Sequence, residues 1–357
     1  MSAVHRKVTI GVLNYNGAPY IQKALERLQA VRYESIEAIL LLDNGSTDGS
    51  IDILSKCAHN VHVIASPVNH GAAGGRNRLL EAAQTDLVLL LDIDSFPEPD
   101  SLQLMIDAYE ADPDRIAIVH PRIVQESDPT LTEYDGTRVH FLGTGSVQNR
   151  HARVHAVSDQ TRIVTCTGGN TLVSKRNVAE SGWYDEDFFF GYEDQDFTVR
   201  ATLSGKLCVQ VSRAIIRHGE GTAGVSMRTG VKYSSTRAFY YTRNRQYFIF
   251  KTYAWSTLLV LAPALLVYEM MQLAFMVWSG NGRPWARAWL AFLRTFGSTM
   301  RKRRRVQQHR VVPDREIVCG DPMTFPFGLD SGRWLRRAIG LVDTFFNSYW
   351  RVVRPLI

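Results

Sequence analysis

The sequence predicts an α/β protein with a mostly parallel central sheet flanked by helices, followed by a C-terminal helical region that associates with a membrane. Three observations lead to this prediction. Short apolar runs alternate with helical patterns through about residue 124, which is typical of βαβ units. Polar residues follow three of these runs directly. From residue 233 onward, aromatic and basic residues crowd around one long apolar stretch.

Composition limits the class of protein. With 357 residues, of which 45% are hydrophobic, the chain can form one large domain or a domain with an appendage. The net charge of +6 and the pI of about 9.1 suit phosphate-bearing ligands, nucleic acid or an anionic membrane. The four cysteines form no CxxC pair, so neither a zinc site nor a disulfide framework is indicated. The N-terminus lacks the apolar stretch of a signal peptide, and we expect this part of the chain in the cytoplasm.

The first strands and helices alternate in order. Helices, the first near residues 18 to 31, separate the predicted strands VTIGVL, IEAILLLD, VHVIAS and DLVLLLD. Their continuous apolarity predicts burial on both faces of the sheet, and ligands of such sheets bind beyond the carboxyl ends of the strands. Polar residues stand at three of these ends, and we expect them to converge on one rim: Asn14, Tyr15 and Asn16, then Asp43 and Asn44, then Asp92 and Asp94.

The next part of the chain is mixed. We expect strands near 139 to 147 and 162 to 173, a TGGN loop at Gly168 and Gly169, a helix near 193 to 204, and a strand pair, KLCVQV and AIIRH. The predicted division is one domain over 1 to 232, with a first half near 7 to 124 and a second half near 125 to 232. A helical, basic and aromatic-rich region covers 233 to 357.

The DxD sequence at Asp92 and Asp94 indicates a metal site. Residues two apart on an extended chain share a face, and carboxylate oxygens are the ligands that Mg²⁺ and Mn²⁺ prefer. The alternative is that Asp92 begins a turn and Asp94 caps the next helix. His218, beside a glycine after a strand, is a further candidate ligand, or else a structural histidine.

Two residues suggest nucleotide contacts. Asp43 could accept a hydrogen bond from a nucleobase imide, although a turn aspartate often bonds its own backbone. Arg76, in NHGAAGGRN, could engage phosphate as a bidentate donor, although it could also be a surface arginine at a helix start. The amides of Gly168 and Gly169 could line a diphosphate or acceptor site, or form only a tight turn.

The acidic pair Glu193 and Asp194 follows the aromatic run FFFGY. A hydroxyl is a poor nucleophile, so a carboxylate beside a substrate hydroxyl could remove its proton during attack. Partial burial would bring the pKa of Asp194 closer to the working pH. The alternative is a solvated acidic first turn that complements the helix dipole.

Six motifs in order, LNYNG, LLDNGSTDGS, NHGAAGGRN, LLDIDS, TGGN and FFFGYEDQDF, carry a family resemblance. Over about residues 7 to 221 the chain resembles the family 2 glycosyltransferases of the GT-A fold. It is most similar to bacterial rhamnosyltransferase-like enzymes of cell-surface polysaccharide biosynthesis. LNYNG departs from the more usual proline-containing version of its motif, which leaves the nucleotide open.

The resemblance implies that residues 1 to 232 are a catalytic domain, with a nucleotide-sugar half near 7 to 124 and an acceptor half near 125 to 232. It also implies a role for each matching residue. The nucleotide-sugar would contact Asn14, Tyr15, Asn16, Asp43, Arg76, Asp92, Gly168 and Gly169. Asp92, Asp94 and His218 would hold Mn²⁺ or Mg²⁺. Of Glu193 and Asp194, the second better matches the catalytic base. Either Arg76 or Arg243 would supply a cation for the departing diphosphate.

The predicted function is a metal-dependent, inverting glycosyl transfer from a UDP- or dTDP-sugar to a lipid-linked or other glycan acceptor. One base without a second nucleophilic carboxylate implies inversion, a conclusion that rests partly on the resemblance. A nucleotidyltransferase is the second reading, disfavoured because no GxGTR-like loop follows the first strand. A noncatalytic membrane-bound scaffold is the third.

The C-terminal region contains residues 255 to 278, long enough to cross a bilayer but interrupted by Pro263, Glu269 and Gln272. Basic clusters on both sides, including RKRRR at 301 to 305, favour a re-entrant or in-plane arrangement at the cytoplasmic face of the membrane. A soluble helical subdomain and a homo-oligomer contact are the alternatives. No nucleic-acid-binding module accompanies the basic run, so nucleic acid is not an expected partner.

Overall fold

The computed structural model describes residues 6–57, 60–219, 233–323 and 333–357. The described residues form two compact units. The first contains those of 6–137 and 147–219, and the second contains those of 138–146 and 233–357. The segment 138–146, which we expected in the acceptor half of the catalytic domain, therefore groups with the C-terminal helices.

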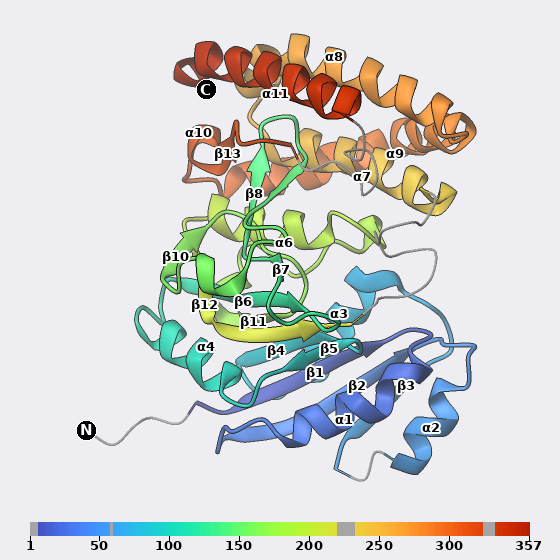
Figure 1. The fold of residues 1–357 in the computed structure, drawn as a ribbon, viewed down its shortest axis with the longest axis vertical. Coiled ribbons are helices and arrows are strands. Elements are labelled where there is room, and N and C mark those ends of the chain that lie inside the picture. The colour runs from blue at the N-terminus through green and yellow to red at the C-terminus, as the bar shows by residue number, and fades with distance from the viewer. Residues whose placement is uncertain (1–5, 58–59, 220–232, 324–332) are drawn as a thin grey trace. The chain divides into compact units, whose positions relative to one another are not determined.

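The first unit is built on one large sheet in the order β10-β12-β6-β11-β4-β1-β2-β3 (Figure 1). Neighbouring strands in this order are parallel, with two exceptions. Strand β11 is antiparallel to β6 and β4, and β10 is antiparallel to β12. Short β5 and β7 pair with β12 and β6. The strands are β1 (Val8–Asn14), β2 (Ile36–Asn44), β3 (His62–Ser66), β4 (Leu87–Asp92), β5 (Ser95–Pro97), β6 (Ile116–Gln125), β7 (Thr132–Tyr134), β10 (Thr161–Val164), β11 (Thr171–Ser174) and β12 (Leu207–His218).

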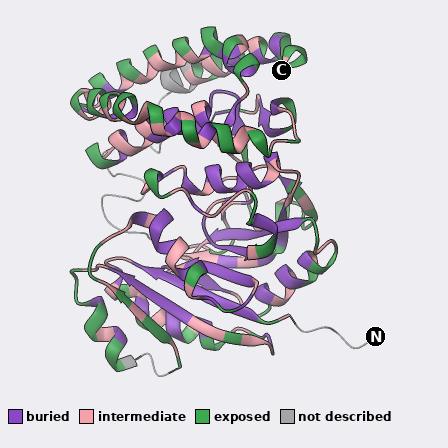
Figure 2. Cartoon of the chain, turned by 180° about the vertical axis from the view of Figure 1, so that it is seen from behind, coloured by how far each residue is buried: buried purple, intermediate pink, exposed green. Residues whose placement is uncertain are grey.

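Helices cover both faces of this sheet, and the alternation of β4 shows why. Leu87, Leu89 and Leu91 pack into a core with α1, α2 and α4, whereas Val88 and Leu90 pack into a second core with α3, α5 and α6. The central strands are thus buried on both sides (Figure 2). The helices are α1 (Ile21–Gln29), α2 (Ser50–Cys57), α3 (Gly71–Ala82), α4 (Ser101–Glu110), α5 (Lys175–Val178) and α6 (Glu193–Leu203), with 3₁₀ turns η1 (Ala18–Tyr20), η2 (Val154–Ala156) and η3 (Glu186–Phe188).

Three of the strand predictions differ from the structure. The expected strand at 139 to 147 is the hairpin of β8 (Thr137–His140) and β9 (Gly145–Val147). The expected strand at 162 to 173 is divided into β10 and β11, because the chain turns through the glycine loop between them. The expected pair at 206 to 218 is the single strand β12. Its register shifts between Val211 and Ile215, next to Pro121, which has no N–H to donate.

The second unit is helical. It contains α7 (Ser235–Thr252), α8 (Trp255–Trp278), α9 (Gly282–Gln308), α10 (Asp314–Ile317), α11 (Arg333–Val353), η4 (Arg354–Leu356) and β13 (Val318–Cys319), which pairs with β8. The basic run 301 to 305 lies near the end of the long helix α9. Among the described residues, one helix is long and apolar enough to cross a membrane, and this helix is α8.

Candidate active site

The carboxyl ends of β1, β2 and β4 meet at one edge of the sheet. Asn14 is the register partner of Asp43, and Leu13 is the partner of Asp92. The polar residues after these three strands therefore lie on a common rim, as the strand pattern predicted.

Asn14 and Asp43 are buried and bound to each other. Asn14 Nδ2 donates to Asp43 Oδ1 at 2.7 Å and to Ser46 Oγ at 3.2 Å, and Ser46 N donates to Asp43 Oδ2 at 3.2 Å. Asn14 Oδ1 is buried without a hydrogen-bond partner among the described residues. An orphaned acceptor in a polar pocket is an atom that a ligand donor can satisfy.

Asn16 shapes the same end of the sheet. It adopts a positive φ of 51°, a conformation that asparagine tolerates better than most residues. Its backbone N donates to Ser46 Oγ at 2.9 Å, and its Oδ1 accepts from Thr47 N at 2.8 Å. Tyr15, between Asn14 and Asn16, is partly exposed. The loop after β1 is thus tied to the loop after β2.

Arg76 joins the DxD aspartate to the acidic pair. Its Nη2 donates to Asp92 Oδ1 at 3.0 Å and Oδ2 at 3.2 Å, while Nη1 donates to Asp194 Oδ1 at 2.7 Å and Glu193 Oε1 at 3.4 Å. We call these four residues the Arg76 cluster. The predicted metal-binding and catalytic carboxylates, about a hundred residues apart in the chain, are therefore held by one guanidinium.

The Arg76 cluster carries more carboxylates than cations. The Arg76 side chain is 5% exposed, whereas those of Asp92 and Asp194 are 33% and 22% exposed. Burial raises the pKa of Asp194 to about 6, although Arg76 opposes the shift. Burial and the neighbouring Asp194 raise the pKa of Glu193. Glu193 Oε2 is buried without a hydrogen-bond partner among the described residues.

The glycine loop approaches this cluster closely. A Cβ on Gly169 would lie 2.5 Å from Arg76 Nη2 and 3.0 Å from Asp92 Oδ2, so a larger residue would displace both. Asp92 N donates to Asn170 Oδ1 at 3.0 Å. A Cβ on Gly168 would meet the Tyr134 hydroxyl at 2.6 Å. The loop therefore forms part of the site instead of a remote turn.

Asp94 lies against His218 rather than in the Arg76 cluster. His218 Nε2 is 3.5 Å from Asp94 Oδ2, and its Nδ1 is 2.7 Å from Glu133 Oε2. Burial alone would lower the pKa of His218, but Asp94 and Glu133 outweigh it and raise the pKa well above its ordinary value. Pairing of β5 with β12 places Ser95 opposite His218, which fixes this contact.

The expected ligand set of Asp92, Asp94 and His218 is not assembled as three residues around one point. In the described part of the chain, no group of three His, Cys, Asp or Glu side chains is placed to hold a metal. Arg76 instead engages Asp92. Asp94 and His218 still offer two donors, and hard cations such as Mg²⁺ commonly take one or two protein ligands with substrate phosphates completing the shell. The residues fit a cation on those terms.

The backbone before the acidic pair is unusual. Phe189 and Tyr192 have positive φ values of 60° and 73°, which non-glycine residues rarely adopt. Phe189 O accepts from Ala72 N at 2.7 Å at the start of α3, where a Cβ on Gly71 would lie 2.2 Å from that oxygen. This contact brings the start of α6, and with it Glu193 and Asp194, to the helix that carries Arg76.

One predicted residue belongs to the other unit, and two residues near the predicted ones were not predicted. Arg243 belongs to the second unit, where its guanidinium stacks over the rings of Phe239, Tyr240 and Tyr247. Glu133 and Tyr134, which lie at His218 and Gly168, were not predicted. The sequence carries no local signal for either, because both partners are distant in the chain.

Comparison with known proteins relates the part of the chain that carries this site to a family. Residues 9–181 match the model of the Glycosyl transferase family 2. The chain is 28% identical over 131 residues to an uncharacterized glycosyltransferase of a Nostoc species, covering 36% of this chain and 40% of that protein. It is 27% identical over 183 residues to poly-β-1,6-N-acetyl-D-glucosamine synthase of Staphylococcus aureus, covering 50% and 42%. The chain thus spans about two fifths of the length of these relatives.

Solved structures show the same fold. A crystal structure of GalNAc-T7 with UDP, GalNAc and Mn²⁺ matches with a TM-score of 0.56 at 11% identity, covering 71% of this chain and 49% of that one. The mannosyltransferase PcManGT of Pyrobaculum calidifontis, in complex with GDP-Man and Mn²⁺, matches with a TM-score of 0.51 at 14% identity, covering 98% and 88%. At these identities the likeness concerns the fold alone, which is GT-A.

Proposed function

Because residues 9–181 of this chain are a glycosyltransferase family 2 domain, we propose that the protein transfers a sugar from a nucleoside diphosphate to an acceptor hydroxyl with inversion at the anomeric carbon. The observation that carries the proposal is the Arg76 cluster. It brings the DxD aspartate and the acidic pair at the start of α6 to one guanidinium.

Asp194 is the proposed catalytic base. Its carboxylate is partly exposed and so remains accessible to an acceptor hydroxyl. Its raised pKa makes it a stronger base than an ordinary aspartate while leaving it ionised near neutral pH. Glu193 is more deeply buried than Asp194 and has a raised pKa. It is therefore better suited to orienting Arg76 than to removing a proton.

The leaving group is a nucleoside diphosphate. Asn14, Tyr15, Asn16 and Asp43 are the proposed contacts of the nucleoside, since they share the rim with Asp92 and contain an unsatisfied acceptor. Gly168 and Gly169 are the proposed lining of the diphosphate site, since a Cβ on Gly169 would collide with Arg76 and Asp92. When bound, Mn²⁺ or Mg²⁺ would neutralise charge developing on the diphosphate, and Asp94 and His218 are the side chains that would hold it. Two neighbours of the fold bind Mn²⁺ with a nucleotide or nucleotide sugar.

The proposed donor is a UDP- or dTDP-sugar, and the proposed acceptor is a lipid-linked glycan at the cytoplasmic face of a membrane. The similarity to a poly-β-1,6-N-acetyl-D-glucosamine synthase supports a glycan acceptor. The apolar helix α8 supports a membrane location.

The test is metal-dependent transfer or hydrolysis with a panel of nucleotide sugars. Asp194→Asn should lower the rate by about 10² to 10⁴-fold, the usual contribution of a general base, while donor binding stays within a few-fold. Asp107→Asn, an exposed aspartate on α4 of the same unit, is the matched control and should retain the parent rate. Parent-like activity of Asp194→Asn would exclude this residue as the base. Release of pyrophosphate from a nucleoside triphosphate would instead indicate a nucleotidyltransferase.

A further inference from the structure

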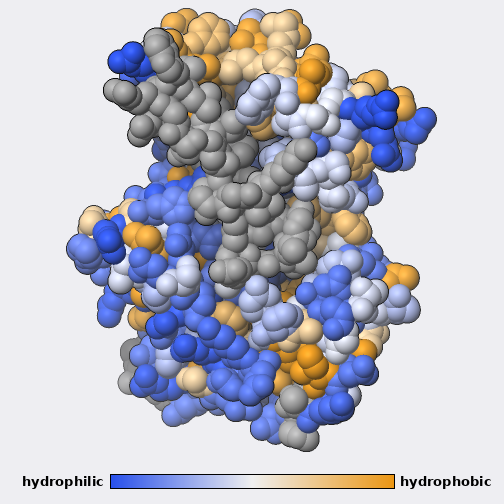
Figure 3. Space-filling model, turned by 45° about the vertical axis from the view of Figure 1, so that its right-hand side comes forward, coloured by the Kyte–Doolittle hydropathy of each residue, from blue (hydrophilic) through white to orange (hydrophobic). Residues whose placement is uncertain are grey.

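Helix α8 presents an uncharged, apolar face along its whole length. Its outward residues recur at helical spacing and include no charged side chain. They are Trp255, Leu259, Leu266, Met270, Leu273 and Val277, exposed by between 37% and 79%. We call these six residues the α8 stripe. Figure 3 shows hydrophobic side chains gathered over the C-terminal helices. A continuous apolar face of this length on a soluble surface marks an interaction site.

A second apolar row stands on the neighbouring helix α11. Tyr349 Oη on α11 donates to Val260 O on α8 at 2.6 Å, and the rings of Phe346 and Tyr268 lie 6.5 Å apart. These contacts lay the two helices side by side (Figure 1). Among the α11 residues whose side chains are described, the exposed large hydrophobic ones are Leu341, Phe345 and Val352. The apolar surface is therefore wider than a single helix.

Helix α9 runs antiparallel to α8 and is basic along its length. The turn at 279 to 281 joins the end of α8 to the start of α9, and Arg303, near the end of α9, lies 4.2 Å from the ring of Trp255 at the start of α8. Exposed arginines recur from one end of α9 to the other: Arg283, Arg287, Arg294, Arg301 and Arg304. We call these residues the arginine row.

This arrangement decides how α8 can meet a bilayer. If α8 crossed the membrane, α9 would lie at the same depths, and arginines such as Arg287 and Arg294 would enter the hydrocarbon, where charged side chains are costly. A spanning α8 would also carry Glu269, in its second half, into the hydrocarbon. Glu269 pairs with Arg245 and accepts a hydrogen bond from Gln246 Nε2 at 2.7 Å. With α8 in the plane of the membrane, the stripe enters the acyl boundary and the arginine row stays at the depth of the headgroups.

We infer that the α8 stripe, with the exposed face of α11, docks in the plane of a bilayer that carries anionic headgroups. The apolar stripe, the arginine row and the exposed tryptophans Trp255 and Trp278 at the two ends of α8 all match the layers of such an interface. The inference deepens the proposed function, because it gives a surface by which the enzyme would reach a lipid-linked acceptor. Its tests measure membrane contact and do not require transfer.

Flotation of the full chain with vesicles of equal parts phosphatidylcholine and phosphatidylglycerol tests the surface. The parent should float with these vesicles and more weakly with phosphatidylcholine alone. Leu266→Lys and Met270→Lys should each weaken binding about tenfold or more, since each removes a buried apolar side chain from the bound state. The matched control is Ile163→Lys, which alters a hydrophobic residue of 66% exposure on β10 and should bind like the parent.

Several results would overturn the inference. One is a parent that does not float. Another is parent-like flotation of both stripe variants. A third is conversion of a dimer to a monomer by these variants, seen by light scattering, with vesicle binding unchanged; this would assign the stripe to a second copy of the chain. Sugar release by the parent in detergent tests the proposed function separately, and its failure would leave the flotation result standing.

Cysteine labelling distinguishes an in-plane helix from a spanning one. Ser256→Cys and Arg283→Cys place thiols just inside the start of α8 and just beyond its end, both at exposed positions. In sealed inside-out membrane vesicles of an expressing host, an impermeant maleimide should label both above the parent background. Labelling of only one would show that α8 crosses the membrane and would overturn the in-plane inference.

Discussion

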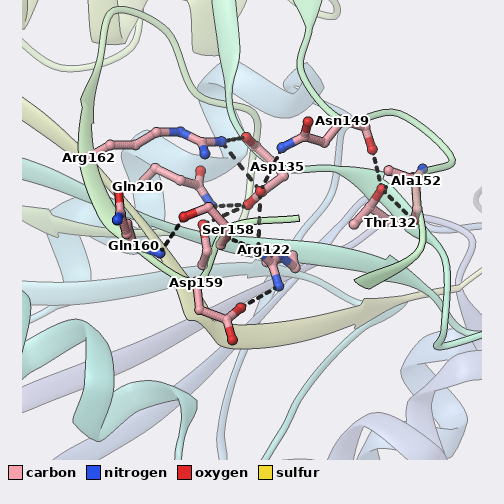
Figure 4. Close-up of polar contacts among 11 residues, drawn as sticks. Arg122, Thr132, Asp135, Asn149, Ala152, Ser158, Asp159, Gln160, Arg162 and Gln210 are labelled. Carbon is pink, nitrogen blue, oxygen red and sulfur yellow. Dashed lines mark hydrogen bonds and ion pairs between the residues drawn. The ribbon is translucent and has the colours of Figure 1, made fainter. Parts of the chain in front are cut away.

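Two polar clusters in the first unit differ in charge balance. The Arg76 cluster surrounds one guanidinium with three carboxylates. The second cluster surrounds the carboxylate of Asp135 with five donors, from Arg122, Arg162, Asn149, Gln210 and Ser212 (Figure 4). We call these six residues the Asp135 cluster. Arg122 also binds Asp159 at 2.9 Å, so two carboxylates face two guanidiniums there.

The pKa shifts follow this difference. Burial alone would raise the pKa of Asp135, but the bonds from Arg122, Asn149 and Arg162 outweigh it and lower the pKa below its ordinary value. At Asp194, burial prevails over Arg76 and the pKa rises. A balanced cluster that ties β6, β12 and the 148–162 segment together suits a structural role. A cluster with excess negative charge suits a site that receives a cationic or proton-donating ligand.

The largest expected effect is on stability, at the Asp135 cluster. Asp135→Ala removes the buried carboxylate that Arg122 binds and should lower the free energy of unfolding by about 3–5 kcal/mol. Asp159→Ala is the matched control, because Asp159 binds the same arginine but is 69% exposed; its cost should stay below about 1 kcal/mol. Urea unfolding followed by circular dichroism measures both. Equal costs would show that burial does not distinguish the two partners.

The next effect is on activity, at the Arg76 cluster. Arg76→Lys keeps the charge but cannot bridge Asp92 and Asp194 with two separate nitrogens, so kcat/KM should fall by roughly 10²-fold. Arg78→Lys, on the same helix and 32% exposed, should change kcat/KM less than about twofold. Steady-state kinetics with the best donor of the panel measures both variants. Equal losses of kcat/KM in the two variants would show that Arg76 has no particular role in transfer.

The pH profile tests the raised pKa of Asp194. A base must be ionised, so the rate should be constant above a pH of about 6 and fall about tenfold per unit below it. An ordinary aspartate would hold the rate constant down to about 4. The profile of kcat/KM, taken over a range in which the parent stays folded by circular dichroism, makes the comparison. A plateau that extends to pH 4 would contradict the effect of burial on this carboxylate.

The parts of the site that local sequence could predict are those set by strand ends. Asn14, Asp43 and Asp92 each follow a continuous apolar run, and parallel pairing alone brings such positions together. The glycine loop and the acidic helix start were likewise visible as local patterns, and α8 has the bounds of the apolar stretch.

Contacts between distant segments could not be predicted in the same way. The bond from Arg76 to Asp194 joins residues 118 positions apart, and Arg76, assigned from sequence to phosphate, binds carboxylates instead. The Asp135 cluster was missed although His120 and Arg122 interrupt the otherwise apolar strand β6. A polar residue in a buried strand predicts that a partner exists, but its identity depends on the tertiary fold.

The smallest effect separates function from stability within the Arg76 cluster. Asp194 has a folded pKa of about 6 against an ordinary value of 3.8, so its ionised form destabilises the fold above pH 6, and this penalty vanishes below about 4. Asp194→Asn removes the charge, but it also weakens the bond from Arg76 and should therefore raise the free energy of unfolding at pH 7 by only about 1 kcal/mol. The gain should disappear near pH 4, where Asp194 is neutral in the folded and unfolded states alike. Urea unfolding at the two pH values measures it, and a variant less stable than the parent at pH 7 would mean that the ion pair with Arg76 outweighs the repulsion among the three carboxylates.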